Sequence, residues 1–156
     1  MGLAPYLGNG WVRFQPALSR KVGQISTGVD IADAADRRRL SPACALAMRN
    51  ILREWRVPRQ QAAALLGVSL YTWNRIQNDN WRGCFSQDQL TRASLMLGIY
   101  RNLHSVFDQA LADQWVGLAN SGPLFCGKRP IAFMISGGIL GMYWVRRHLE
   151  SLAQGH

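Results

Sequence analysis

The chain has 156 residues, of which 48% are hydrophobic and 17% are charged. This length and composition suit one ordinary globular domain, or two very small ones that share a core, and they exclude a disordered chain. Eighteen basic residues oppose nine acidic ones, which gives a formal net charge of +9. So one-sided an excess on a chain with few charges indicates a polyanion or an acidic protein as partner.

The basic excess is concentrated in the middle of the chain. Residues 1–40 carry six basic and three acidic groups, residues 41–106 carry eight and three, and residues 107–156 carry four and three. Sixteen of the basic residues are arginines, whose guanidinium groups bind phosphates through two hydrogen bonds at once. The middle segment is therefore the electrostatic candidate for nucleic-acid binding.

The three cysteines, Cys44, Cys84 and Cys126, are widely spaced and form no C-x-x-C motif. This pattern favours a reducing cytoplasm over a disulfide framework or a zinc site. The N-terminus lacks a basic segment followed by an apolar run, so we expect a cytoplasmic protein without a signal peptide. The apolar stretch 130–145 is short for a membrane span and contains three glycines, so we expect a core segment and no membrane partner.

The first 40 residues are predicted to form an irregular arm, because glycines and prolines interrupt every possible period. Trp11, Val12 and Phe14 could anchor this arm on a core or on a second subunit, or the arm could be mobile. Order is expected to begin at Ser41, which would cap a helix that starts at Pro42.

The remaining elements are all predicted to be helical, since apolar residues recur at helical spacing and no alternating strand pattern occurs. The expected helices cover about 42–55, 59–66, 70–77, 86–107, a segment capped by Asp108, a short one that starts at Pro130 and ends at Gly137-Gly138, and a terminal one closed by Gly155. The expected fold class is all-α, with an N-terminal arm over 1–40, a first domain over 41–106 and a second over 107–156.

Residues 59–78 carry the pattern of a helix-turn-helix. Ala63 is small where two helices must approach closely, and Gly67 can adopt the positive φ of a tight turn. Leu66, Val68, Trp73 and Ile76 are predicted to point inward. The segment resembles a helix-turn-helix of the Xre/phage-repressor kind, in which the helix over 70–77 would read DNA.

The residue types on the outer side of this unit suit DNA, because arginine can bind guanine, asparagine can bind adenine, and hydroxyl or amide groups can bind phosphates or bases. The candidate DNA-binding residues are Gln60, Ser69, Tyr71, Thr72, Asn74, Arg75 and Asn78. Arg56, Arg59 and Arg82 flank the unit and could add non-specific attraction. The spacing alone also fits a structural pair of helices without any DNA-binding role.

The last third of the chain carries a second resemblance. The residues that carry it are Phe107-Asp108-x-x-Leu111-Ala112-x-x-Trp115, Asn120, Leu124-Phe125-x-Gly127-x-x-Pro130, Gly138, Gly141, Val145-x-x-x-Leu149 and the closing Gly155-His156. They resemble the toxin-binding domain of the Xre/MbcA/ParS antitoxin family, which follows an Xre-like helix-turn-helix.

The resemblance implies the antitoxin of a type II toxin–antitoxin system. Its partner would be a toxin of the RES-domain class that acts on NAD, and the antitoxin would block the toxin's active site, repress its own operon and form a homodimer. The positions expected to form or support the toxin face are Asn120, Gly127, Arg129, Pro130, Arg146, Arg147 and His148. Gly127 and Pro130 equally suit a turn and a helix start, and the tryptophans Trp55, Trp73, Trp115 and Trp144 suit a core.

Two other classes of function compete with the antitoxin. One is a stand-alone transcriptional regulator whose C-terminal domain dimerises. The other is an enzyme, which the sequence disfavours because it carries no nucleophile–base set, phosphate-binding loop or metal-ligand motif, so we expect no cofactor and no metal.

Overall fold

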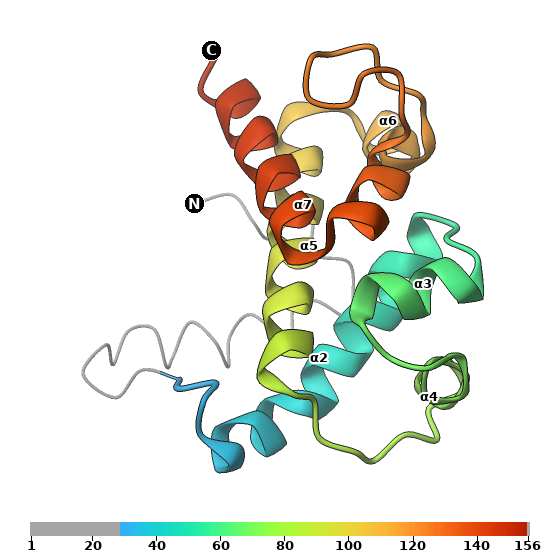
Figure 1. The fold of residues 1–156 in the computed structure, drawn as a ribbon, viewed down its shortest axis with the longest axis vertical. Helices are drawn as coiled ribbons and strands as arrows, with labels where there is room; N and C mark the ends of the chain where they lie inside the picture. The colour runs from blue at the N-terminus through green and yellow to red at the C-terminus, as the bar shows by residue number, and fades with distance from the viewer. Residues whose placement is uncertain (1–28, 156) are drawn as a thin grey trace.

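The computed structural model describes residues 29–155, and these form six α-helices and one short 3-10 helix with no β-strand among them. The elements are α2 (Ala34–Glu54), α3 (Arg59–Leu66), α4 (Leu70–Gln77), α5 (Gln87–Val106), α6 (Gln109–Gln114), η3 (Trp115–Gly117) and α7 (Pro130–Ala153) (Figure 1). The all-α prediction is confirmed. The predicted arm over residues 1–28, with Trp11, Val12 and Phe14, and the terminal His156 lie outside the described residues.

The first described helix begins at Ala34 and not at Pro42, so the predicted helix start is wrong. Asp33 caps α2 by accepting a hydrogen bond from the backbone N–H of Asp36. Ser41 lies inside the helix, where its hydroxyl donates to the carbonyl of Arg37 at 2.6 Å and accepts from the N–H of Phe85 at 2.8 Å. Ser41 therefore links α2 to the segment that leads into α5. Residues 34–40 are helical and do not belong to an irregular arm.

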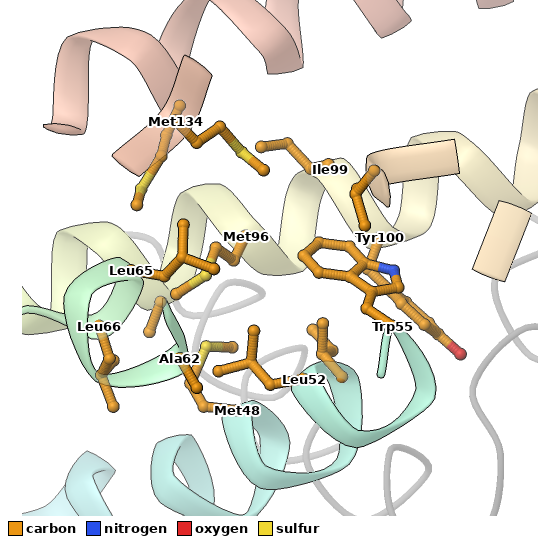
Figure 2. Packing of buried hydrophobic residues seen from close by; sticks show 14 of the residues in the cluster. Met48, Leu52, Trp55, Ala62, Leu65, Leu66, Met96, Ile99, Tyr100 and Met134 are labelled. Carbon is orange, nitrogen blue, oxygen red and sulfur yellow. The ribbon is translucent and has the colours of Figure 1, made fainter. Parts of the chain in front are cut away.

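Helix α5 lies at the centre of the fold, with α2 against one part of its surface and α7 against another (Figure 1). Figure 2 shows how Met48 and Leu52 of α2 and Leu65 of α3 face Met96 of α5, while Met134 of α7 covers the same cluster from above. One buried cluster continues from Cys44 on α2 to Leu149 on α7. Helix α5 ends at Val106, and a shared core joins the segments on either side of that residue.

Helix α7 changes direction at Gly138, which has φ 60° and ψ −143°. Residues other than glycine rarely adopt this conformation, because their Cβ atoms clash with the backbone. Figure 1 shows the two arms of α7 meeting at an angle beside α5. The predicted break at Gly137-Gly138 is confirmed.

Three of the four tryptophans expected in the core are buried: Trp55, Trp73 and Trp115. Trp144 is 49% exposed, so the prediction for it is wrong. It lies on the outer side of α7, because Met142, Val145 and Leu149 already occupy the side that faces α5. No helix in the described part of the chain is long and apolar enough to cross a membrane.

Candidate nucleic-acid interface

The turn between α3 and α4 depends on Gly67. Its φ of 75° places it in the left-handed region, and its N–H donates to the carbonyl of Ala63 at 2.9 Å. The neighbouring helix fixes the turn from outside, since the Gln89 side chain donates to the carbonyl of Gly67 at 3.0 Å. A side chain at position 67 would meet both the positive φ and the guanidinium of Arg92, whose Nε would lie 3.0 Å from an added Cβ.

Helix α4 is held against the core by Trp73 and Ile76, which are both buried, and Val68 packs partly buried beside them. Ser69 caps the helix, because its hydroxyl accepts a hydrogen bond from the N–H of Thr72 at 3.1 Å. These contacts fix one side of α4 and leave the opposite side in solvent. The predicted bounds of both helices, the inward residues and the cap are confirmed.

The outer side of α4 presents Tyr71 and Arg75 one helical turn apart. Tyr71 is 72% exposed, and the Arg75 guanidinium carbon lies 5.9 Å from the centre of its ring. Arg75 also donates to the carbonyl of Asn80 at 2.9 Å. An aromatic ring and a backbone carbonyl thus orient an exposed guanidinium group, which reduces the side-chain entropy that ordering on a ligand would cost.

The other candidate residues lie around this pair. The Thr72 hydroxyl accepts a hydrogen bond from Ser69, and the Asn74 side chain accepts a long one of 3.5 Å from Arg59. Gln60 is exposed in the first turn of α3, and Asn78 is exposed at the C-terminal end of α4. The structure therefore places the predicted residues along α4 and at the start of α3.

Three further arginines flank α4, two of which the sequence analysis did not single out. Arg49, Arg53 and Arg56 line an open cleft of about 460 Å³ beside Trp73 and Gln77. Arg49 and Arg53 are one turn apart on α2, so their i, i+4 spacing was a readable signal that was missed. They place guanidinium groups beside α4 on the C-terminal half of α2, where Arg49 pairs with Asp79 at 3.4 Å.

The comparison with known protein families supports the assignment of α3 and α4 as a helix-turn-helix. Residues 32–98 match the antitoxin Xre-like helix-turn-helix domain. The match covers α2, α3 and α4 and the first part of α5, and it indicates an antitoxin or a DNA-binding regulator. No curated protein and no solved structure matches the chain. We refer below to residues 32–98 as the Xre-like region.

Beyond the Xre-like region, the loop before α7 is closed by its own backbone. The N–H of Gly127 donates to the carbonyl of Asn120 at 2.8 Å, and the N–H of Asn120 donates to the carbonyl of Lys128 at 3.1 Å. The Asn120 side chain accepts from the N–H of Gly122 at 2.8 Å, and Gly127 has a φ of 85°. Asn120 and Gly127, which the sequence analysis placed on a toxin face, are therefore brought together and determine the shape of this loop.

The remaining candidates of the C-terminal part occupy α7. Arg129 is the exposed N-cap, and Pro130 is buried in the first turn. Arg146 and Arg147 both pair with Glu150, through contacts of 3.0 and 3.2 Å. Arg147 is exposed, whereas Arg146 packs against α5 so closely that a Cβ on Gly98 would lie 2.9 Å from its Nε.

His148 packs among aromatic rings. Its ring centre lies 6.5 Å from that of Trp115 and 5.5 Å from that of Phe125. Burial in this cluster lowers the pKa of His148, since a charged imidazole loses hydration there. His148 thus fastens α7 to η3 and the preceding loop, and only part of its ring remains accessible.

An exposed apolar face on α7 was missed by the sequence analysis. Leu140 is 63% exposed, and Tyr143 and Trp144 are both exposed by more than two fifths. Arg147 follows at the next helical position, so the four residues share one side of the helix at i, i+3, i+4 and i+7. We call Leu140, Tyr143, Trp144 and Arg147 the α7 face.

Proposed function

We propose that this protein is the antitoxin of a type II toxin–antitoxin pair, which binds operator DNA through α4 and a toxin through residues 107–155. The observation that carries the proposal is the match of residues 32–98 to an antitoxin Xre-like domain. It is supported by a helix-turn-helix whose second helix is anchored by buried residues on one side and exposes Tyr71 and Arg75 on the other.

The DNA-binding part of the proposal assigns base contacts to α4 and phosphate contacts to its surroundings. Arg75 would bind a guanine edge, while Tyr71, Thr72, Asn74 and Asn78 would contact neighbouring bases or phosphates. Gln60 and Ser69 lie at the N-terminal ends of α3 and α4, where helix N–H groups favour a phosphate. The arginines of the cleft, Arg49, Arg53 and Arg56, would add attraction that depends on salt concentration but not on sequence.

The toxin-binding part assigns the contact surface to the loop before α7 and to α7 itself. Interfaces draw most of their affinity from a few aromatic and arginine side chains. The α7 face offers two aromatic rings and an arginine on one rigid helix, with Arg129 exposed at the helix start. The resemblance of residues 107–156 to a toxin-binding domain suggests a RES-domain toxin that acts on NAD. Asn120, Gly127 and Pro130 would support the surface by shaping the loop.

The proposed mechanism joins the two surfaces. The antitoxin would cover the toxin and keep NAD from its active site, while the complex, with two antitoxin copies, would repress its own promoter. Proteolytic loss of the antitoxin would release both the toxin and the promoter.

A second candidate function is favoured by the α7 face alone. An exposed apolar side of a helix can equally pair with the same side of a second copy, because a two-fold axis brings identical patches together. The protein would then be a stand-alone regulator that dimerises through α7.

The decisive experiment is co-expression of the full chain with the product of the neighbouring gene. The antitoxin proposal expects that the neighbour arrests growth alone, that co-expression restores growth, and that the two proteins copurify. A neighbour that is harmless and does not bind the chain would contradict it. Gel-shift titration on the shared promoter tests DNA binding separately, and the mass of the isolated chain in solution, with and without Trp144→Ala, tests dimerisation through α7.

A further inference from the structure

We propose that Glu54, His104 and Asp113 form a binding site for a divalent transition-metal ion, with zinc as the best-suited ion. The three residues come from three helices, α2, α5 and α6, and none of them belongs to α4. The site does not depend on the proposed antitoxin function.

The geometry brings one ligand atom of each residue into a small volume. Glu54 is the last residue of α2, His104 lies in the last turn of α5, and Asp113 lies in α6. Their donor atoms all lie within 4.8 Å of one another, and His104 Nε2 is 3.0 Å from Asp113 Oδ1. In a tetrahedral zinc site with bonds of about 2.0–2.1 Å, neighbouring ligand atoms are about 3.4 Å apart, so small rotations of the carboxylates suffice.

Each of the three ligands is oriented by a partner outside the site. His104 Nδ1 lies 2.9 Å from the backbone carbonyl of Tyr100, which can only accept, so Nδ1 carries a proton and Nε2 is directed at the carboxylates. The Tyr100 hydroxyl donates to Glu54 at 2.7 Å, and the Gln109 amide donates to Asp113 at 3.0 Å. Outer hydrogen bonds of this kind, above all from a histidine N–H to a carbonyl, are characteristic of metal ligands.

The charges of the site favour a cation. Among the described residues, no arginine or lysine forms an ion pair with Glu54 or Asp113. If the imidazole is neutral, two carboxylates and a lone pair converge, and Arg56, which lines the same cleft, forms no ion pair with either carboxylate.

The site is also accessible and has room for a fourth ligand. Glu54 and Asp113 line an open cleft of about 460 Å³ between the end of α2 and the segment α6–η3, and His104 lies buried behind them. Trp55 lines the same cleft, and its buried Nε1–H has no hydrogen-bond partner. The site has three protein ligands, one of them an imidazole, and one open position. This set suits zinc better than calcium or magnesium.

The test uses the full chain with Cys84→Ser and Cys126→Ser, because these exposed thiols would bind zinc by themselves. After treatment with a chelator, zinc is added and the melting temperature and the binding isotherm are measured. Cobalt is then added in place of zinc, and the visible absorption of a four-coordinate cobalt site is recorded.

The expected result is a single site per chain, a zinc-dependent rise in melting temperature, and a cobalt spectrum. Asp113→Asn and Glu54→Gln should each weaken zinc binding by roughly tenfold or more. Asp88→Asn and Glu150→Gln, which remove carboxylates elsewhere, should leave it unchanged. If Asp113→Asn fails to fold, Glu54→Gln and the cobalt spectrum of the parent chain decide. No zinc binding in the parent chain, or equal binding in all four variants, would overturn the proposal.

Discussion

Helix α4 and the second half of α7 share one arrangement but expose different side chains. Each follows a glycine with positive φ, Gly67 or Gly138, and each buries one side against the core. The exposed side of α4 is mainly polar, with Arg75 placed over Tyr71, whereas the exposed side of α7 carries two aromatic rings and a leucine.

This difference shows which partner chemistry each helix suits. Base edges and phosphates offer hydrogen bonds and negative charge, so a reading helix needs polar side chains that are held in place. A protein partner offers apolar pockets, so a docking helix gains affinity from desolvating rings. The two helices are therefore expected to fail separately when either is changed.

The largest expected effect is on partner binding by α7. Replacing Tyr143 and Trp144 by alanine should weaken binding of the cognate toxin by about 2 kcal/mol or more, because buried aromatic side chains dominate interfaces. Isothermal titration of the toxin measures this, and unfolding should change little because both rings are exposed. Leu152→Ala, at an exposed position nearer the end of α7, is the control. If operator binding falls as much as toxin binding, the two surfaces are not separate.

The next effect concerns the bend that orients the α7 face. Gly138→Ala should lower the free energy of unfolding by about 1–3 kcal/mol, since alanine is strained at φ 60°, ψ −143°. Gly137 is helical and has no atom near the position of an added Cβ. Gly137→Ala should therefore be neutral or slightly stabilising. Equal urea denaturation midpoints for the two variants would show that the bend is not conformationally demanding.

A comparable or smaller effect is expected on the DNA side. Arg75→Ala should weaken operator binding by about 1–3 kcal/mol and relax sequence preference at one base pair, because it would remove the proposed base contact. Arg147→Ala removes an exposed arginine of the α7 face and should spare operator binding. Fluorescence anisotropy with specific and scrambled duplexes measures both. A loss of affinity that is the same on every sequence would reassign Arg75 to the phosphates.

The smallest expected effect is on the pH dependence of stability, through His148 on the partly buried side of α7. His148 has a pKa below 6.5 in the folded chain, so below pH 6.5 the unfolded chain binds a proton that the folded chain resists. Stability should therefore fall as the pH drops from about 7 to about 5. His148→Phe, which keeps the aromatic contacts, should lose less stability over that range. Melting curves at both pH values test this, and an equal loss in the two proteins would contradict it.

Local sequence signals predicted much of the chain correctly because they act over a few residues. The bounds of α3 and α4, the caps Ser69, Ser86 and Asp108 and the turn at Gly67 all depend on neighbours within one helical turn. The helix start predicted at Ser41 was wrong because one contact of this residue is not local. Its hydroxyl accepts a hydrogen bond from the N–H of Phe85, which lies far along the chain. The Ser-Pro pair therefore resembles a helix cap in sequence but does not cap a helix.

The sequence by itself determined the helical periods, the position of the second helix of the helix-turn-helix and the break in α7, since each follows from the spacing of apolar residues or from a residue with special backbone freedom. Only the tertiary structure decided that Trp144 stays outside the core, because Met142, Val145 and Leu149 fill the one side of α7 that packs on α5. It also decided that Glu54, His104 and Asp113 meet. Their spacing along the chain carries no such signal, since their proximity arises from the packing of α2 and α6 around the end of α5.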